Sequence, residues 1–574
     1  MENGAVILGL ALLAFAAGYF VYSRFLGRVV GIDPGRKTPA VAERDDVDYM
    51  PAHPLVLFGH HFAAIAGAGP IVGPVFAAEF GWGAVALWVI LGSVFIGAMH
   101  DMLALFLSVR HHGKSIGVVI GELIGAPARI LFLMFSWSVL VLVVAEFTRQ
   151  IAITFVSDPA IATSSMLFIA EAVVFGLCVY RLRMSLVVSS LIFVPLMFAS
   201  VWIGELYPLD LTAFGLSADA TRTVWILILL GYCFLASVCP IWVLLQPRGY
   251  LSSYLLYVMA ALGIFGVLVA HPTLTLPAFT GFSVAHGEGC VDPLFPLLFV
   301  LVSCGACSGT HAIIASGTTS KQLANERHIR PIGYGGLLLE GVLAIVAIVA
   351  IAGVYANSSD YFADIASKSP AQLFASAIAG FCAKVGIPLR LSSGFILLSI
   401  SAFLMTTVDA CARLARFSWQ ELLGNEELRM KNEECRTARF FCGFSRNTYA
   451  ATFVVCAAAA VLLLGNSHAR ESLWAILMSA NQLIAALTLL AATLWLARNR
   501  KPRWMTILPM LFMFVVSVWA LWLILLNSIS LGDVIRTLAT GFLLLLAIVL
   551  VVLAVLRKNA GASLTPTFDK MVKS

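Results

Sequence analysis

The chain has 574 residues, of which 60% are hydrophobic and only 11% are charged. With a mean hydropathy of +0.96, this composition excludes a soluble globular domain and indicates a polytopic membrane protein. The formal net charge of +6 is small for this length, and no basic patch interleaved with aromatic residues is present, so we expect no nucleic-acid partner. The expected surroundings are a lipid bilayer.

Apolar stretches long enough to cross a bilayer recur along the whole chain. A membrane-spanning helix needs about 20 apolar residues, a length that predicts about fifteen spans here. The first lacks the basic leader and the small-residue cleavage site of a secretory signal, so we expect it to be retained. The predicted spans are residues 4–24, 56–78, 84–110, 128–157, 163–180, 185–206, 222–245, 250–270, 293–318, 333–355, 392–416, 447–465, 473–497, 505–527 and 536–556.

The charges of the loops predict the orientation. Lys and Arg gather in alternate loops, around residues such as Arg24, Lys114, Arg248 and Arg413, whereas the intervening loops are poor in bases. Because cytoplasmic loops carry the excess of basic residues, we expect the N-terminus outside and the C-terminus in the cytoplasm. Residues 370–386 are apolar but short, and they are predicted to form a helix that caps the outer vestibule.

Two of the apolar spans are interrupted by residues that break helices. Residues 66–74 contain three glycines and two prolines, and residues 304–311 contain two further glycines. Non-helical backbone inside a bilayer is tolerated only where it is buried in protein or lines a cavity, and a pair of broken helices points to a transport site. The sequence therefore predicts a secondary transporter in which both segments are non-helical and contact each other.

Unwound segments supply the groups that bind a carboxylate or a cation. The amides at a half-helix N-terminus attract a carboxylate, and the carbonyls at a C-terminus coordinate a cation. Alternatively, the glycines serve only close helix packing. Close packing alone would not need the combination of Pro and Gly residues in this segment. The candidate substrate-binding residues are His61, Gly67, Gly69, Pro70, Ser308, Gly309, Thr310 and His311.

Ionisable residues inside spans cost about 2.5 to 3.5 kcal/mol each, so every one needs a partner or a role. Asp409 and Arg413 lie four residues apart on one helix face, which predicts an ion pair that is either a structural clamp or part of coupling. Hydroxyl and carbonyl oxygens suit sodium, whereas His and carboxylates carry protons. The candidates for the coupling ion are Thr406, Thr407, Asp409 and Ala66, and the candidate proton carriers are His60, Asp101 and Glu340.

Cysteine and histidine spacing favours neither a metal site nor an enzyme. Cys304 and Cys307 form a CxxC without a second pair at metal spacing, so packing is the favoured interpretation. No HExxH and no nucleophile elbow is present, and a channel would need a ring of filter elements. We expect no enzymatic activity, no metal and no cofactor; a metal-dependent membrane enzyme using His60, His61, His100 and Asp101 is the remote alternative.

Motifs along the chain resemble the carbon starvation protein A family. Those motifs are His60-His61-Phe62 through Gly69-Pro70, then Gly97-Ala98-Met99-His100-Asp101, Gln246-Pro247-Arg248, Ser308-Gly309-Thr310-His311, and Thr406-Thr407-Val408-Asp409 with Arg413. The resemblance covers about residues 50–500. It implies an importer of peptides, or alternatively pyruvate, in the bacterial inner membrane, associated with nutrient limitation. It also favours protons as the coupling ion, whereas the hydroxyl pair favours sodium.

The resemblance further implies an all-α fold with a LeuT-like inverted-repeat core. Spans 56–78 and 293–318 would be its two broken helices, and span 392–416 would present Thr406 and Thr407 to the first of them. Two of the five spans between residues 128 and 270 would be an insertion. We expect one transmembrane transporter domain, residues 1–574, with a core at about 50–500 and peripheral helices at 4–24, 505–527 and 536–556. The oligomeric state is left open.

Overall fold

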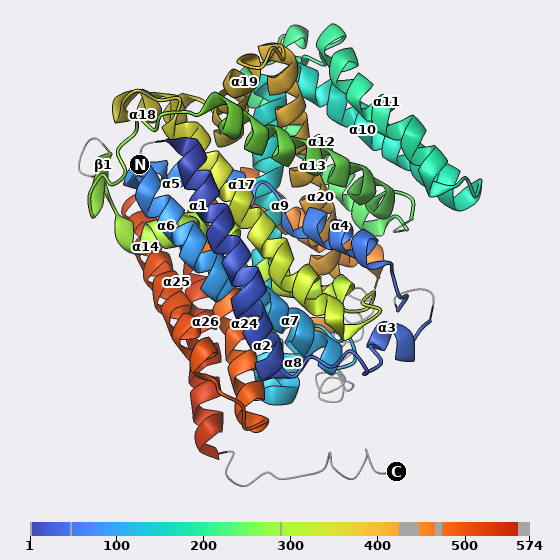
Figure 1. The fold of residues 1–574 in the computed structure, drawn as a ribbon, viewed down its shortest axis with the longest axis vertical. Coiled ribbons are helices and arrows are strands. Elements are labelled where there is room, and N and C mark those ends of the chain that lie inside the picture. Colours follow the sequence, from blue (N-terminus) through green and yellow to red (C-terminus); the bar gives the residue numbers. More distant parts are fainter. Residues whose placement is uncertain are drawn as a thin grey trace.

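The protein is a bundle of long helices with one antiparallel pair of short strands, β1 and β2 (Figure 1). The computed structural model describes residues 3–45, 49–240, 242–286, 290–423, 447–464 and 473–560. The first elements are α1 (Gly4–Ala17), α2 (Ser23–Val30), α3 (Pro39–Ala42), α4 (Pro54–Ile65), α5 (Gly69–Ala77), α6 (Trp82–Gly92), α7 (Ala98–Arg110), α8 (Ile116–Leu123), α9 (Ala126–Ser157), α10 (Pro159–Gly176), α11 (Leu186–Leu206), α12 (Ala218–Val238) and α13 (Leu245–Ala270). The remaining elements are β1 (Ser283–His286), β2 (Cys290–Pro293), α14 (Leu294–Leu301), α15 (Ser303–Ala306), α16 (Gly309–Ile314), α17 (Gly335–Ala352), α18 (Ser358–Ser367), α19 (Pro370–Ala383), α20 (Leu389–Leu423), α23 (Thr448–Leu464), α24 (Trp474–Arg498), α25 (Trp504–Ser530) and α26 (Val534–Ala560).

The all-helical membrane architecture is confirmed. Within the described residues, 13 helices are long and apolar enough to cross a membrane by length and composition. Two further predicted spans take other forms, because 293–318 is divided into α14, α15 and α16 and 447–465 contains the 17-residue α23. The predicted vestibule cap corresponds to the 14-residue α19.

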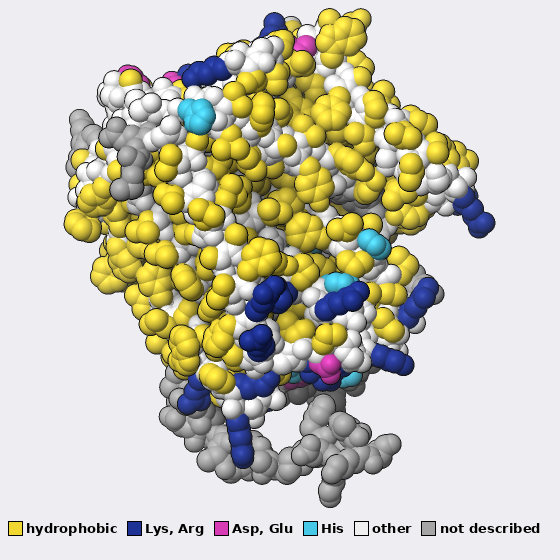
Figure 2. Space-filling model, viewed as in Figure 1, with side chains coloured by type: hydrophobic (Ala, Val, Ile, Leu, Met, Phe, Trp, Pro, Cys, Tyr) yellow, Lys and Arg dark blue, Asp and Glu magenta, His cyan; other side chains and the backbone are white. Residues whose placement is uncertain are grey.

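Burial differs sharply between the central and the outer helices. The most apolar stretches of α17, α20 and α24 are 89%, 94% and 89% buried, whereas those of α11 and α25 are only 28% buried. Figure 2 shows a largely apolar face, with Lys and Arg side chains gathered mainly toward the end where α2, α3 and α8 lie in Figure 1. An exposed apolar belt of this kind requires a lipid environment, because water would not solvate it favourably.

The first helix break is shorter than predicted. Helix α4 ends at Ile65 and α5 begins at Gly69, so only residues 66–68 leave the helix. The prediction that residues 69–74 are non-helical is wrong. Pro70 lies in the first turn of α5, where a missing N–H costs nothing, and the glycines reduce helix propensity without preventing a helix that tertiary packing supports.

The second break is also short. Cys307 and Ser308 are extended between α15 and α16, and α16 continues into a π-helical turn, Ala315–Thr319. The prediction of non-helical backbone therefore holds for these two residues and is wrong for the rest of 304–311. A break needs only enough residues to change the direction of the chain.

The two broken helices contact each other closely, as predicted. A Cβ atom added to Gly69 would lie 2.3 Å from the Cys304 Sγ, and one added to Gly73 would lie 2.5 Å from the carbonyl oxygen of Leu301. Close approach of this kind requires small residues at the crossing. Part of the glycine content thus serves packing.

Helix α13 begins earlier than predicted, at Leu245 instead of about residue 250. Arg248, which the loop count treated as a cytoplasmic base, is fully buried within this helix. Pro247 occupies the first turn of α13, where proline is tolerated. The charge of Arg248 therefore needs a buried partner. Arg248 no longer counts among the basic residues of the cytoplasmic loops.

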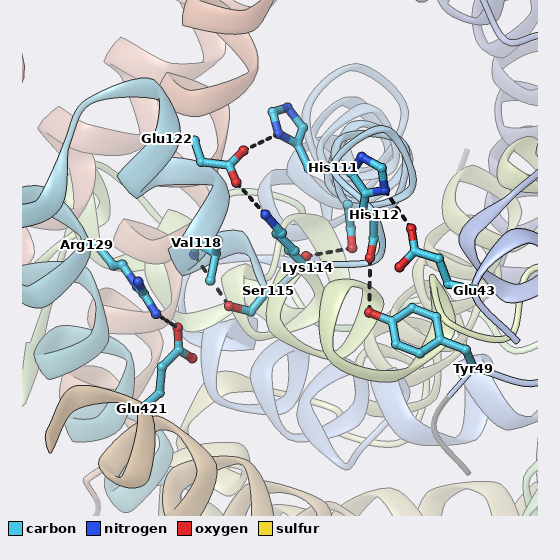
Figure 3. Close-up of polar contacts among 11 residues, drawn as sticks. Glu43, Tyr49, His111, His112, Lys114, Ser115, Val118, Glu122, Arg129 and Glu421 are labelled. Carbon is cyan, nitrogen blue, oxygen red and sulfur yellow. Dashed lines mark hydrogen bonds and ion pairs between the residues drawn. The ribbon is translucent and has the colours of Figure 1, made fainter. Parts of the chain in front are cut away.

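Polar contacts tie the loop between α7 and α8 to its surroundings (Figure 3). The His111 Nδ1 and the Lys114 Nζ lie 2.7 and 2.9 Å from the two carboxylate oxygens of Glu122, and the His112 Nδ1 lies 2.6 Å from the Glu43 Oε1. Partial burial tends to raise the pKa of Glu122, but the hydrogen bonds from Lys114 and His111 outweigh it and leave the pKa below its ordinary value.

Candidate functional site

A small cavity lies where both helix breaks meet α9, α20 and α24. Its volume is about 20 Å³, which is room for about one water molecule. Gly67 comes from the first break, Cys304 and Thr310 flank the second, Thr407 comes from α20 and Asn481 from α24. Two of the predicted substrate-binding residues, Gly67 and Thr310, therefore line this cavity.

The side-chain amide of Asn481 already accepts a hydrogen bond from the free backbone N–H at the second break. The Thr310 N–H donates to the Asn481 Oδ1 at 2.8 Å, and the Asn481 Nδ2 donates to the Ser308 hydroxyl at 2.9 Å. Gly309 packs so closely that a Cβ atom there would lie 2.2 Å from the Asn481 carbonyl oxygen. Sequence reasoning missed Asn481, although a polar residue inside the apolar span 473–497 is a usable signal.

Three residues singled out separately in the sequence form one buried cluster. The His311 Nδ1 lies 2.7 Å from the Asp101 Oδ2, and the His311 Nε2 lies 3.6 Å from the Glu340 Oε1. The other Asp101 oxygen, Oδ1, is 2.7 Å from the His100 Nδ1. All four side chains are fully buried. The cluster joins α7, α16 and α17 beside the second break.

The histidine pair before the first break does not join this cluster. The His61 Nδ1 lies 2.8 Å from the Thr319 Oγ1, which links α4 to the turn after α16. His60 is half-buried, and within the described ranges no hydrogen bond or ion pair connects it to His311. Of the predicted proton carriers, the structure therefore brings together Asp101 and Glu340 but not His60.

Asp409 on α20 is paired with Arg248 on α13. The Asp409 Oδ2 accepts a hydrogen bond from the Arg248 Nη1 at 2.5 Å and another from the Tyr232 hydroxyl at 2.8 Å. Both members of the ion pair are fully buried. The Asp409 Oδ1 and the Arg248 Nε make no hydrogen bond within the described part of the chain.

The predicted ion pair between Asp409 and Arg413 is wrong. The Arg413 Nη2 donates instead to the carbonyl oxygens of Ala236 and Cys239, at 3.0 and 2.5 Å. The last carbonyls of a helix have no intrahelical donor, so the end of α12 supplies the partner that Arg413 needs. Helical spacing alone did not reveal this competing acceptor.

The two threonine hydroxyls of α20 do not converge on one ion. The Thr406 Oγ1 lies 3.2 Å from the Ser252 Oγ of α13 and donates to the Ala402 carbonyl. Thr407 faces the first break, because a Cβ atom on Gly67 would lie 3.0 Å from its hydroxyl. The sodium ligands expected from Thr406, Thr407 and Ala66 are thus divided between two sides of the helix.

Many apolar spans, two broken helices in contact and a cavity between them are the features of a secondary transporter. The family model "Carbon starvation protein CstA" matches residues 3–367 and 355–520. The chain belongs to the carbon starvation protein CstA family, and the resemblance deduced from its motifs is confirmed.

Curated relatives match nearly the whole chain. "Peptide transporter CstA" of Escherichia coli (strain K12) is 32% identical and covers 91% of this chain and 81% of its own. "Pyruvate/proton symporter BtsT" of the same organism is 30% identical and covers 88% of this chain and 80% of its own. "Peptide transporter CstA" of Bacillus subtilis (strain 168) is 29% identical and covers 96% of each chain. Among solved structures, MhsT in complex with L-phenylalanine matches 87% of this chain and 99% of its own, with 12% identity and a TM-score of 0.43.

Proposed function

We propose that this chain is a secondary active importer of small carboxylate-bearing nutrients, most directly peptides, with pyruvate as the alternative. The observation that carries the proposal is the small cavity between two contacting helix breaks. Relatives named as peptide transporters and as a pyruvate/proton symporter support the same substrate class. We place the chain in the bacterial inner membrane, with its N-terminus outside and its C-terminus in the cytoplasm.

The polar groups at the second break are suited to a substrate carboxylate. The Thr310 amide and the Ser308 hydroxyl are donors, and both are now bonded to Asn481. A cavity of about 20 Å³ is too small for either substrate, so loading requires the surrounding helices to separate. As they separate, the substrate carboxylate replaces the Asn481 Oδ1 at the Thr310 amide.

The ion pair between Arg248 and Asp409 favours protons over sodium as the coupling ion. The Arg248 Nη2 lies 3.5 Å from the Ala402 carbonyl oxygen, the same oxygen to which Thr406 donates. A fixed guanidinium at this place repels a second cation, because charges interact strongly in a low-dielectric interior. The Asp409 carboxylate, with one oxygen unbonded in the described part of the chain, takes a proton instead and weakens its link to α13.

Uptake into vesicles of purified protein tests this function. Radiolabelled peptide and pyruvate are offered with an inward pH gradient or an inward sodium gradient, each imposed alone. We expect the pH gradient to drive accumulation of at least one substrate above equilibrium and the sodium gradient at equal pH to drive none. Accumulation with sodium alone would contradict proton coupling, and no accumulation of either substrate would contradict the proposed import.

A LeuT-like core is part of the same proposal. Helix α13 packs on α4 and α20, and α24 packs on α14, α15 and α16, so each broken helix has one equivalent neighbour, as an inverted repeat requires. Helix α11 packs mainly on α10 at the edge of the bundle, and α10 also packs on α9, α13 and α20. We assign this pair as the insertion between residues 128 and 270.

A further inference from the structure

Three buried side chains beside the second helix break present metal-ligand atoms to one another. The Cys304 Sγ, a ring nitrogen of His311 and a carboxylate oxygen of Glu340 all lie within 4.8 Å of one another. Each comes from a different helix, namely α15, α16 and α17. All three side chains are buried.

The ligand atoms of this group lack ordinary partners. The His311 Nε2 and both Glu340 oxygens make no hydrogen bond in the part of the chain that the structure describes. The Cys304 thiol makes a long contact of 3.9 Å to the Ser308 hydroxyl and otherwise interacts with His311 itself, the neighbour within this group. Leaving a buried carboxylate without a partner is costly, so three such atoms that face one another indicate a missing common partner.

The surroundings of His311 have the arrangement that metal sites use. The His311 Nδ1 is hydrogen-bonded to Asp101 at 2.7 Å, and Asp101 is in turn bonded to His100 at 2.7 Å. A carboxylate that accepts the Nδ1–H fixes the tautomer in which Nε2 carries the free lone pair, and it orients the ring toward a metal. The chain His100, Asp101, His311 therefore leaves the Nε2 available as a ligand.

We propose that Cys304, His311 and Glu340 bind one divalent transition-metal ion of the zinc class. A thiolate, an imidazole and a carboxylate together match the ligand preferences of zinc. The separation of 3.6 Å between the His311 Nε2 and the Glu340 Oε1 is close to the roughly 3.3 Å that separates nitrogen and oxygen ligands in a tetrahedral zinc site. The same 3.6 Å is too long for a hydrogen bond.

The position of the ligands gives the ion a mechanical consequence. Cys304 precedes the break and His311 follows it, while Glu340 belongs to the continuous helix α17. A bound ion joins both halves of the broken helix to α17 and fixes the angle between them. The charge of the dication is matched by the thiolate and the Glu340 carboxylate.

Metal binding to the full chain, purified in detergent without substrate, tests the site. Cobalt(II) is the spectroscopic probe, since a bound thiolate gives a sulfur-to-cobalt charge-transfer band in the near ultraviolet. We expect one cobalt ion per chain with this band, and its displacement by zinc. The Cys304→Ala and Cys304→Ser variants should lose the band, whereas Cys307→Ala, the matched change in the same CxxC, should retain it. Asp101→Asn should weaken zinc binding by about 10 to 100-fold, as expected for a group that orients a ligand.

Thermal melting and size-exclusion profiles establish that each variant is folded. Zinc should raise the melting temperature of the native chain and of Cys307→Ala but not of Cys304→Ser. Failure of the native chain to bind zinc or cobalt stoichiometrically would overturn the proposal, and so would an unchanged cobalt spectrum in Cys304→Ala. Because no readout involves uptake, the result is independent of the proposed transport function.

Discussion

At the scale of single residues, the most informative finding is that buried charges find partners far along the chain. Asp409 and Arg248 are 161 residues apart, yet they form a fully buried pair. Sequence spacing identified Asp409 as a residue that needs a partner, but it selected Arg413 because an i, i+4 neighbour is the only partner that a single sequence displays. Long-range pairs become visible only when helices are placed in space.

Breaking this pair should destabilise the fold in a way that one second change reverses. Asp409→Asn leaves Arg248 charged and buried, a loss of about 3 to 5 kcal/mol, and should lower the melting temperature. Adding Arg248→Gln should restore the melting temperature, whereas adding Arg413→Gln should not. Uptake driven by a pH gradient should be absent from the single variant and from the restored double variant. A melting temperature restored by adding Arg413→Gln, and not by adding Arg248→Gln, to Asp409→Asn would contradict the structure.

Asn481 offers a test of where the substrate carboxylate binds. Asn481→Asp places a permanent carboxylate beside the Thr310 amide, where it competes with the substrate. We expect the KM for uptake to rise by about tenfold, the equivalent of about 1.4 kcal/mol, while Asn481→Ala should not compete in this way. Initial uptake rates at a range of substrate concentrations measure the difference. An equal effect of both changes would argue against binding at this amide.

At the scale of elements, the helix breaks are short because packing supports helix wherever it can. Gly73 faces the backbone of Leu301 in α14, and Gly69 packs against the Cys304 side chain of α15, so the substitution Gly69→Ala should cause overpacking that costs about 1 to 3 kcal/mol. Gly231→Ala in α12 is the matched control, because a Cβ atom there meets nothing within 4 Å. Melting temperatures of the two variants in the same detergent give the comparison. Equal values would contradict the close crossing.

The loop between α7 and α8 should depend on pH. The pKa of Glu122 is lowered in the folded chain from an ordinary value of 4.5, so its contacts stabilise the fold above that value and are lost as the pH falls through the lowered pKa. Because Glu122 is partly exposed, we expect less than about 1 kcal/mol. The melting-temperature difference between the native chain and Glu122→Gln should be present at pH 7, shrink as the pH falls below 4.5 and vanish below the lowered pKa of Glu122. A difference that grows in acid would refute this assignment.

Much of the element level could be predicted, because it follows from local chemistry. Apolar length located the spans, and glycine and proline content located both breaks. The limits of the breaks could not be deduced, since Pro70 is compatible with a helix start and Gly69 with a tight crossing. Likewise, His311, Asp101 and Glu340 were each recognised as unusual, but their meeting depends on how α7, α16 and α17 pack. Asn481 was missed because a single sequence does not show which face of α24 packs against the second break.

At the scale of the whole molecule, the two ends of the bundle are expected to face different compartments. Lys114 and Lys368 are 46% and 53% exposed, and the charge of the loops places the former in the cytoplasm and the latter outside. A membrane-impermeant maleimide applied to intact cells should label Lys368→Cys but label Lys114→Cys only after the membrane is opened. Labelling of the native chain gives the background that comes from its own cysteines. The reverse pattern would invert the proposed orientation.

The close contacts of α5 with α14 and α15 also bear on which parts of the molecule we expect to move together. A Cβ atom on Gly73 would meet the backbone of Leu301, and one on Gly69 would meet the Cys304 side chain, so we expect these helices to resist sliding past each other and to move together. Helices α9 and α20 pack along each other, and we expect them to form the opposing body. The cavity has walls from both, Gly67 and Cys304 on one side and Thr407 on the other. A ligand in this cavity lies between the two groups of helices. We therefore expect its binding to change the angle between them.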